Sequence, residues 1–281
     1  MAADRILITG AGGFLGRYVV AQLPTACGIT RAECDLTDLA AVRRTCDQIQ
    51  PTLVIHLAAK IPGRGTDSLE TIFRENVLAT ANLLSCLPAT GYFLYSSTLD
   101  VYGDSPPTPI TERTPTDPVT DYAIMKLAAE KVTQARAPAR AGILRFTHLY
   151  GAGDHGIKLI PKVMETVARG DTPVIFGDGS DLRDFLHVTD AARAVVLAAQ
   201  TRATGIFNVA SGHSLTVRET VEAILHAFQK PVAPIFKPRQ KPRLDFSFDT
   251  SRLRSELQFQ PQITFAVGLT ALCETVNGEL S

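Results

Sequence analysis

A tyrosine and a lysine lie four positions apart, at Tyr122 and Lys126, in a stretch with helical periodicity from Asp121 to Ala135. Residues at this spacing lie on the same side of a helix. A phenol titrates at a pH of about 10, and a neighbouring ammonium group favours its phenolate form. The pair can therefore exchange a proton with a substrate oxygen, although the same spacing also arises by chance on helix surfaces.

Hydroxyl side chains follow a predicted apolar strand from Tyr92 to Tyr95, at Ser96, Ser97 and Thr98. Open parallel sheets bind their ligands at the carboxyl ends of the strands. A hydroxyl group there can bind a substrate carbonyl or alcohol oxygen, or it can cap the turn that follows the strand. The segment strengthens the interpretation that the tyrosine and the lysine belong to a site.

A glycine-rich turn separates a predicted strand, Arg5 to Thr9, from a predicted helix, Arg17 to Leu23. Absent side chains permit a tight turn, close approach of a pyrophosphate and close helix packing, and the helix N-terminus attracts phosphate. The turn therefore predicts a dinucleotide site. Its residues are Gly10, Ala11, Gly12, Gly13, Phe14, Leu15 and Gly16.

The second strand is predicted to be short, from Ala26 to Thr30, and Arg31 follows it directly. An acidic residue near this position binds the 2′-hydroxyl of NAD, whereas a guanidinium group can pair with the 2′-phosphate of NADP. Arg31 therefore favours NADP(H), with NAD(H) left possible because Glu33 lies two residues further on.

Strands and helices alternate along the first half of the chain, and this rhythm predicts an α/β fold with a doubly wound parallel sheet. After Tyr150 short strands mix with helices, and prolines cluster in a segment expected to be extended and irregular. We expect a Rossmann domain of residues 1–155 plus about 182–210. A smaller α+β substrate-binding domain would comprise residues 156–181 and 211–281.

Composition narrows the functional class. The chain has 281 residues and equal numbers of basic and acidic side chains, 28 each, so a nucleic-acid partner is not expected. No apolar run is long enough for a membrane helix. The five cysteines are scattered, without Cys-x-x-Cys, which predicts a cytoplasmic protein with no zinc or other metal site.

These motifs together resemble the extended short-chain dehydrogenase/reductase family, in its group of NAD(P)-dependent nucleotide-sugar epimerases, dehydratases and reductases. The resemblance covers nearly the whole chain. Further motifs that carry it are Asp35-Leu36-Thr37-Asp38, His56-Leu57-Ala58-Ala59, Asn76, Val101-Tyr102-Gly103, Leu144-Arg145, Tyr150-Gly151, Phe176-Gly177-Asp178-Gly179-Ser180, Arg183-Asp184-Phe185 and Phe207-Asn208-Val209-Ala210-Ser211-Gly212.

The resemblance implies roles for individual residues. Thr98, Tyr122 and Lys126 would form the catalytic triad, and Lys126 would also hold the nicotinamide ribose. Asp35 and Leu36 would contact adenine. The remaining implied residues are Leu57, Ala58 and Ala59 for the nicotinamide ribose and His148, Arg183, Arg239 and Arg243 for the substrate and its diphosphate, although both Arg239 and Arg243 can equally be solvated charges.

Three departures from the family pattern shape the expected reaction. Leu99 and Asp100 replace the Asp-Glu pair of sugar-nucleotide dehydratases, so dehydration is disfavoured. His148 stands where many members carry asparagine. The compressed segment from Thr30 to Leu36 is most similar to that of NADPH-dependent 4-keto-6-deoxysugar reductases.

We therefore expect a reductase acting at C4 of a nucleotide-diphosphate sugar. The alternatives are a 4-epimerase that retains NAD⁺, a non-catalytic dinucleotide-binding module and a reductase of non-sugar ketones. Lys60, Ile61, Arg64 and His155 are expected in the substrate pocket.

A homodimer is also implied, formed by the helices Phe73–Leu87 and Asp121–Ala135. Leu83, Leu84, Leu127 and Val132 would form its apolar surface or pack in the core instead.

Overall fold

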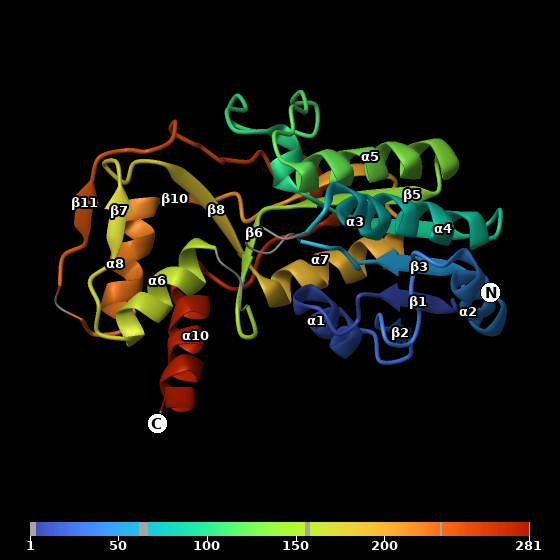
Figure 1. The fold of residues 1–281 in the computed structure, drawn as a ribbon, viewed down its shortest axis with the longest axis horizontal. Coiled ribbons are helices and arrows are strands. Elements are labelled where there is room, and N and C mark those ends of the chain that lie inside the picture. The colour runs from blue at the N-terminus through green and yellow to red at the C-terminus, as the bar shows by residue number, and fades with distance from the viewer. Residues whose placement is uncertain (1–3, 62–66, 155–157, 231, 281) are drawn as a thin grey trace.

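The computed structural model describes the chain except residues 1–3, 62–66, 155–157, 231 and 281, and gives only the backbone of 275–280. Its main element is a parallel sheet of six strands in the order β2-β1-β3-β4-β5-β9 (Figure 1). Its strands are β1 (Ile6–Thr9), β2 (Cys27–Ile29), β3 (Leu53–His56), β4 (Tyr92–Thr98), β5 (Ala141–Phe146) and β9 (Gly205–Val209).

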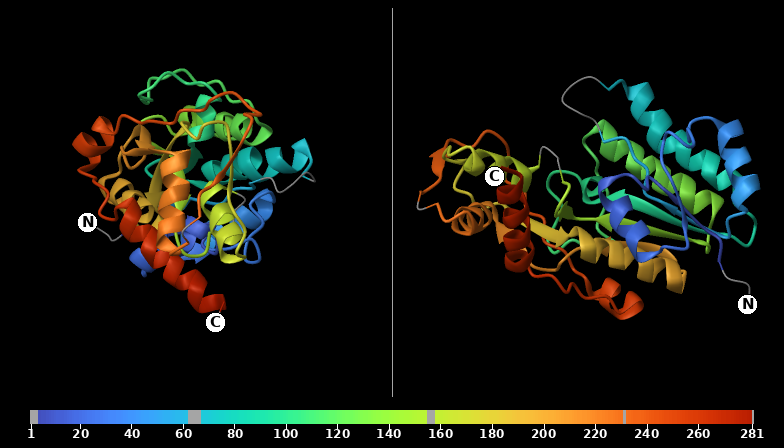
Figure 2. Two further views of the ribbon diagram at one scale, coloured as in Figure 1. Left: turned by 90° about the vertical axis from the view of Figure 1, so that its left-hand side faces the viewer. Right: turned by 90° about the horizontal axis from the view of Figure 1, so that it is seen from below.

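Helices cover both faces of this sheet, as Figure 2 shows from below. Alternate strand residues point to opposite faces, so Ile8 and Leu94 pack in one core, whereas Leu7 and Phe93 pack in the other. The first core is covered by α1 (Phe14–Gln22), α7 (Val188–Thr201) and α9 (Ser251–Leu257), and the second by α2 (Leu39–Ile49), α4 (Ala79–Cys86) and α5 (Asp121–Arg136). The predicted doubly wound α/β fold is confirmed.

The helix predicted from Phe73 to Leu87 is interrupted. It comprises α3 (Leu69–Phe73), a π-helical turn η1 (Arg74–Leu78) and α4. Such turns insert one residue into the helical ladder and often lie at functional sites. Here the turn carries the buried side chain of Asn76, which bonds the backbone of Lys60, a residue that lines the cavity described below.

A second group of elements lies beyond β5. One small sheet has the order β10-β8-β6 and another pairs β11 with β7. The proline-rich segment, expected to be irregular throughout, therefore contains a short strand. The remaining elements are β6 (His148–Tyr150), α6 (Leu159–Ala168), β7 (Val174–Phe176), β8 (Leu182–His187), β10 (Ser214–Thr216), α8 (Val217–Ala227), β11 (Ile235–Lys237), α10 (Phe265–Leu280) and the 3-10 turn η2 (Leu99–Tyr102).

We propose the division into two domains on these sheets. The six-stranded sheet belongs to the nucleotide-binding domain, and the small sheets with α6, α8 and α10 belong to the substrate-binding domain. Strand β8 pairs with β6 and β10, so residues 182–187 contribute to the small sheet, whereas α7 and β9 belong with the large one. Among the described residues, no helix has the length and apolar character needed to span a membrane.

Candidate functional site

A cavity of about 250 Å³ lies beside the glycine turn, at the carboxyl ends of β1, β2 and β3. The structure brings together eight of the residues that the sequence assigns to cofactor binding. Phe14, Leu15 and Gly16 in the first turn of α1, and Tyr122 and Lys126 on α5, are not among its lining residues. The eight that line it are Gly10, Gly13, Arg31, Asp35, Leu36, Leu57, Ala58 and Ala59.

The glycine turn leaves no room for side chains. Gly10 has φ +73°, and a Cβ atom there would lie 2.6 Å from the Ala58 nitrogen. A Cβ atom on Gly16 would lie 2.0 Å from the Gly10 oxygen. Helix α1 begins directly after Gly13, without a side-chain cap. Its first N–H groups thus remain available to an anion, and the turn fits a dinucleotide pyrophosphate.

Charged residues at the end of β2 differ in their availability. Glu33 accepts hydrogen bonds from the backbone nitrogen and hydroxyl of Thr30, and these bonds lower the pKa of its carboxyl group. Arg31 is 69% exposed and pairs with Glu75, which also lines the cavity. The sequence analysis missed Glu75, because 44 positions separate the partners. Arg31 therefore borders the cavity in an ion pair with Glu75, while Glu33 is bound in a turn.

A buried histidine, His56, connects the end of β1 to α4. The Thr80 hydroxyl donates to the Asn76 carbonyl oxygen at 2.7 Å, so it accepts from Nε2 of His56 at 3.1 Å. Nδ1 of His56 then accepts from the Thr9 hydroxyl at 2.7 Å. Burial lowers the pKa of His56 to about 3, which keeps the ring neutral. The ring orients Thr9, whose oxygen in turn accepts the Ala58 N–H at 3.4 Å.

Asn76 holds the loop that follows Ala59. Its side-chain oxygen accepts the Lys60 N–H at 3.1 Å, and its side-chain nitrogen donates to the Lys60 carbonyl at 3.0 Å. Lys60 lines the cavity, and Ile61 is 64% exposed. Arg64 and His155, also predicted for the pocket, lie outside the described residues.

Lys126 is the most deeply buried member of the predicted catalytic set, at 2% exposure. Its ammonium group donates to the carbonyl of Ser96 and lies 4.3 Å from the centre of the Tyr95 ring. Burial lowers its pKa to about 7, although Glu130 opposes this shift. The lysine therefore changes charge near neutral pH in the protein without ligands.

Asp100 interacts with both Thr98 and Tyr122. In the sequence this carboxylate stood out only as a departure from the family pattern. The Thr98 hydroxyl donates to Asp100 at 3.0 Å. Burial, and then the charge of Asp100, raise the pKa of Tyr122. Without a bound ligand the tyrosine is therefore protonated at neutral pH, and the shift opposes the phenolate form that a nearby ammonium group would favour.

Glu130 and Arg145 form a buried ion pair next to these residues, which the sequence did not predict. Arg145 donates from two nitrogens to both carboxylate oxygens of Glu130, at 3.0 and 2.6 Å. Ser97, next to Thr98, donates its hydroxyl hydrogen to the same carboxylate. Glu130 lies one helical turn after Lys126, and that i+4 position was its only signal in the sequence. The network joins α5, β4 and β5 directly beneath the predicted catalytic residues.

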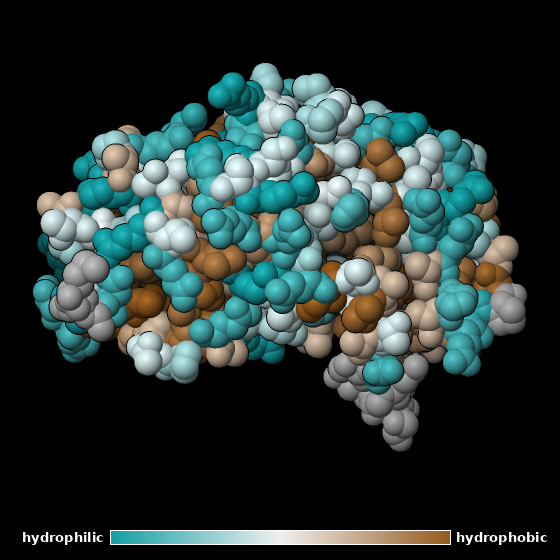
Figure 3. All heavy atoms as spheres, turned by 180° about the vertical axis from the view of Figure 1, so that it is seen from behind, coloured by the Kyte–Doolittle hydropathy of each residue, from teal (hydrophilic) through white to brown (hydrophobic). Residues whose placement is uncertain are grey.

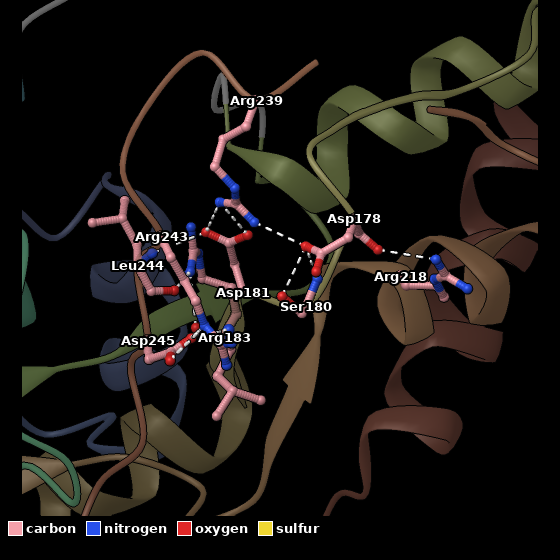
Figure 4. A network of polar contacts seen from close by, with 10 residues as sticks. Asp178, Ser180, Asp181, Arg183, Arg218, Arg239, Arg243, Leu244 and Asp245 are labelled. Carbon is pink, nitrogen blue, oxygen red and sulfur yellow. Dashed lines mark hydrogen bonds and ion pairs between the residues drawn. The ribbon is translucent and has the colours of Figure 1, made fainter. Parts of the chain in front are cut away.

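The predicted substrate arginines lie together but are engaged with acidic or carbonyl groups (Figure 4). Arg239 pairs with Asp178 at 2.9 Å and with Asp181 at 2.8 Å, and Arg243 pairs with Asp245 at 2.8 Å. A diphosphate would have to compete with these carboxylates. The network further includes Arg183, which donates to the carbonyl oxygens of Leu182 and Leu244, and Arg218, which donates to the carbonyl of Asp178.

His148 offers a ligand a hydrogen-bond acceptor, whereas the asparagine that many family members carry there offers an amide donor. Its Nδ1 lies 3.3 Å from the carbonyl oxygen of Asp184, to which it can only donate. Burial, followed by the charges of Lys158 and Arg183, lowers its pKa to about 3. The neutral ring therefore has an unprotonated Nε2, which suits a hydroxyl group better than a phosphate oxygen.

Of the four residues predicted for a dimer surface, Leu83 and Leu84 are buried in the sheet core of the single chain. Leu127 and Val132 are partly buried against two core clusters. The structure thus favours the alternative of core packing, because these side chains face the sheet and neighbouring helices. The apolar side chains that α3 and α5 expose are Leu69, Phe73 and Ile124.

Comparison with known proteins identifies the family. The model of the NAD-dependent epimerase/dehydratase family matches residues 6–210. A UDP-glucose 4-epimerase from Mycolicibacterium smegmatis is 30% identical, over 96% of this chain and 97% of its own. A dTDP-glucose 4,6-dehydratase from Streptomyces niveus is 29% identical, over 96% and 92%. A GDP-6-deoxy-D-mannose reductase from Pseudomonas aeruginosa is also 29% identical, over 96% of both chains.

Solved structures give the same result. The structure of RMD from Pseudomonas aeruginosa complexed with NADPH has a TM-score of 0.87 and 25% identity, and covers 99% of this chain and 100% of its own. The Thermus thermophilus UDP-glucose 4-epimerase complex with NAD has a TM-score of 0.84 and 25% identity, over 98% and 99%. The chain therefore belongs to the NAD-dependent epimerase/dehydratase family, within the extended short-chain dehydrogenases/reductases.

Proposed function

We propose that this protein is an NADPH-dependent reductase of a nucleotide-linked 4-keto-6-deoxysugar. The observation that carries the choice of cofactor is the end of β2, where Arg31 borders the cavity and Glu33 is bound to Thr30. The 29% identical GDP-6-deoxy-D-mannose reductase supports the choice of reaction. Net reduction needs a donor that leaves after each turnover.

Bound NADPH would supply the hydride for C4 of the sugar. Tyr122 would donate its proton to the carbonyl oxygen as negative charge develops there, and the Thr98 hydroxyl, which donates to Asp100 in the structure, would turn its hydrogen to the same oxygen. Lys126 stabilises the tyrosinate that remains and binds the ribose hydroxyl groups. The carbonyl thus gains one hydride and one proton and becomes an alcohol. Solvent then returns a proton to Tyr122.

The second candidate is a 4-epimerase, favoured by the 30% identical UDP-glucose 4-epimerase. The two functions differ in whether the cofactor stays bound. We would denature freshly purified protein and identify any dinucleotide that is released. Stoichiometric NAD⁺ would support the epimerase and exclude our use of Arg31. An empty protein that reduces 4-keto-sugar nucleotides with NADPH would support the reductase.

Replacing Arg31 by alanine should weaken NADPH binding about tenfold, or ~1.4 kcal/mol, and leave NADH binding nearly unchanged. The reason is that only NADPH carries the 2′-phosphate. Glu75→Gln is the matched variant, because it frees Arg31 from its ion pair and should tighten NADPH binding. Equal losses for NADH and NADPH in Arg31→Ala would contradict the assignment. Fluorescence titration of the parent and both variants with NADPH and NADH gives the dissociation constants that test this prediction.

Cofactor binding at pH 8 should take up protons, close to one per chain. The pKa of Lys126 is about 7 before binding, so at pH 8 most chains hold a neutral lysine. The anionic cofactor and its ribose hydroxyls favour the ammonium form and raise that pKa. Calorimetry in two buffers of different ionisation enthalpy measures the uptake. Lys126→Met should abolish it, and binding heats that do not depend on the buffer would contradict the prediction.

We also propose a homodimer formed through α3 and α5, with Leu69, Phe73 and Ile124 as its apolar surface. Phe73→Asp should convert it to monomers, because dimerisation would bury a charge. Light scattering tests this. A monomeric parent protein at micromolar concentration would exclude the dimer.

A further inference from the structure

A second cavity, of about 540 Å³, lies away from the cofactor pocket and shares no lining residue with it. It is bounded by the loop after β9, by the start of α9 and by the segment that connects α9 to α10. Figure 3 shows the face that carries α9, where apolar side chains reach the surface between polar ones. Cavities of this size bind small molecules in many proteins.

Aromatic rings form much of its wall. Phe185 and Phe259 are 7% and 2% exposed, so the protein already holds them in place. The rings of Phe185 and Phe265 lie 5.5 Å apart with an interplanar angle of 31°. Such a wall buries a flat apolar ring efficiently.

His213 and Arg254 line the cavity, and none of its lining residues is acidic. The carboxylates of Asp184 and Asp190 lie behind its walls, where backbone N–H groups bind them. Neighbouring arginines are paired, since Arg252 binds Glu256 and Arg193 binds Asp190. Arg254 forms no ion pair within the described part of the chain. The electrostatic balance therefore favours an anionic group at the mouth of the cavity.

Asp249 is the acidic residue that competes for this charge. Its pKa is lowered chiefly by hydrogen bonds from Ser251 and to a smaller extent by Arg254. Asp249 accepts the N–H of Ser251 at 2.7 Å in the turn that precedes α9, and it forms no ion pair with Arg254 among the described residues. Arg254 thus remains available to a ligand.

Two buried carboxylates keep the cavity open. Asp184 accepts the N–H groups of Ser211 and Gly212, at 2.8 and 2.9 Å, and fixes one wall. Asp190 accepts the N–H groups of Gln262 and Ile263, at 2.9 and 2.8 Å, and fixes the opposite one. Both aspartates are at most 1% exposed. A ligand therefore meets a formed site, which reduces the entropic cost of binding.

We propose that this cavity is a second small-molecule site, which binds a ligand with a flat aromatic ring and one anionic group. The ring packs between Phe185, Phe259 and Phe265, and the anion lies beside Arg254 and His213. The proposal does not depend on the reaction catalysed at the other site.

The test uses anilinonaphthalene sulfonate, a fluorescent aromatic anion, with the full chain in excess NAD⁺ and NADP⁺ to fill the cofactor pocket. We expect one saturable site per chain. Arg254→Glu should weaken binding roughly five- to tenfold, because it replaces attraction by repulsion. Arg44→Glu, an equal change of charge on the exposed side of α2, is the matched control and should leave binding unchanged.

A second variant, Leu215→Trp, fills the cavity from β10 and should reduce the number of bound probe molecules. Three results would overturn the proposal: no saturable binding, equal binding by Arg254→Glu and the parent, or loss of binding when the dinucleotides are present. The last result would place the probe in the cofactor pocket. Because Arg254 is exposed, the Arg254→Glu protein should fold. A loss of binding in this variant therefore reports on the site and not on unfolding.

Discussion

Tyr122→Phe should lower turnover by about 10²- to 10⁴-fold, the usual contribution of a positioned proton donor. The substitution removes the hydroxyl hydrogen and keeps the ring. Cofactor binding should therefore be nearly unchanged, because Lys126 keeps its contact with the Ser96 carbonyl. Steady-state rates with a 4-keto-sugar nucleotide, together with NADPH titration, measure both effects.

The matched control is Tyr18→Phe. Tyr18 donates its hydroxyl hydrogen to the Ala152 carbonyl at 2.9 Å, so the same chemical change removes a structural hydrogen bond outside the catalytic set. That variant should retain most of the parent rate. If Tyr122→Phe turned over at a rate close to that of Tyr18→Phe, the proton would have to come from another group, and Asp100 would be the first candidate because it binds Thr98.

Local sequence patterns predicted the parts of this site that local geometry controls. Gly10 and Gly16 must lack side chains because a Cβ atom at either position would clash with backbone atoms. Tyr122 and Lys126 share a helix face because four residues make about one turn. The doubly wound parallel sheet followed from the alternation of strands and helices.

Partners that lie far apart in the sequence escaped prediction. Arg31 stands out in the sequence, but only the fold places it against Glu75. Leu83 and Leu84 lie on an apolar helix, and periodicity cannot distinguish a face that covers the sheet from one that meets a second chain. Arg239 stands at the family position for a diphosphate ligand, yet Asp178 and Asp181 lie on another segment and bind it.

Glu130→Gln should destabilise the protein by about 3–5 kcal/mol, because it leaves the buried charge of Arg145 without a counterion. Both side chains are at most 3% exposed, and Arg145 already has one nitrogen without a hydrogen-bond partner among the described residues. With roughly 2–4 °C lost per kcal/mol in a chain of this size, the melting temperature should fall by about 6–20 °C. Urea unfolding and thermal scans measure the loss.

Glu165→Gln is the matched control, because Glu165 pairs with Arg169 on the exposed surface of α6 and both side chains are at least 60% exposed. Its effect should stay below about 1 kcal/mol. Equal losses of stability from the two substitutions would show that the buried ion pair contributes no more to stability than the exposed one.

The double variant Glu130→Leu with Arg145→Met separates charge from shape. Replacing both partners of a buried pair by apolar side chains often restores stability, so this protein should be more stable than Glu130→Gln. Its activity should nevertheless remain low, because Ser97 loses the carboxylate that fixes the strand end beside Thr98. Recovery of stability without recovery of turnover would assign Glu130 to the positioning of the catalytic hydroxyl, whereas recovery of both would leave it a purely structural role.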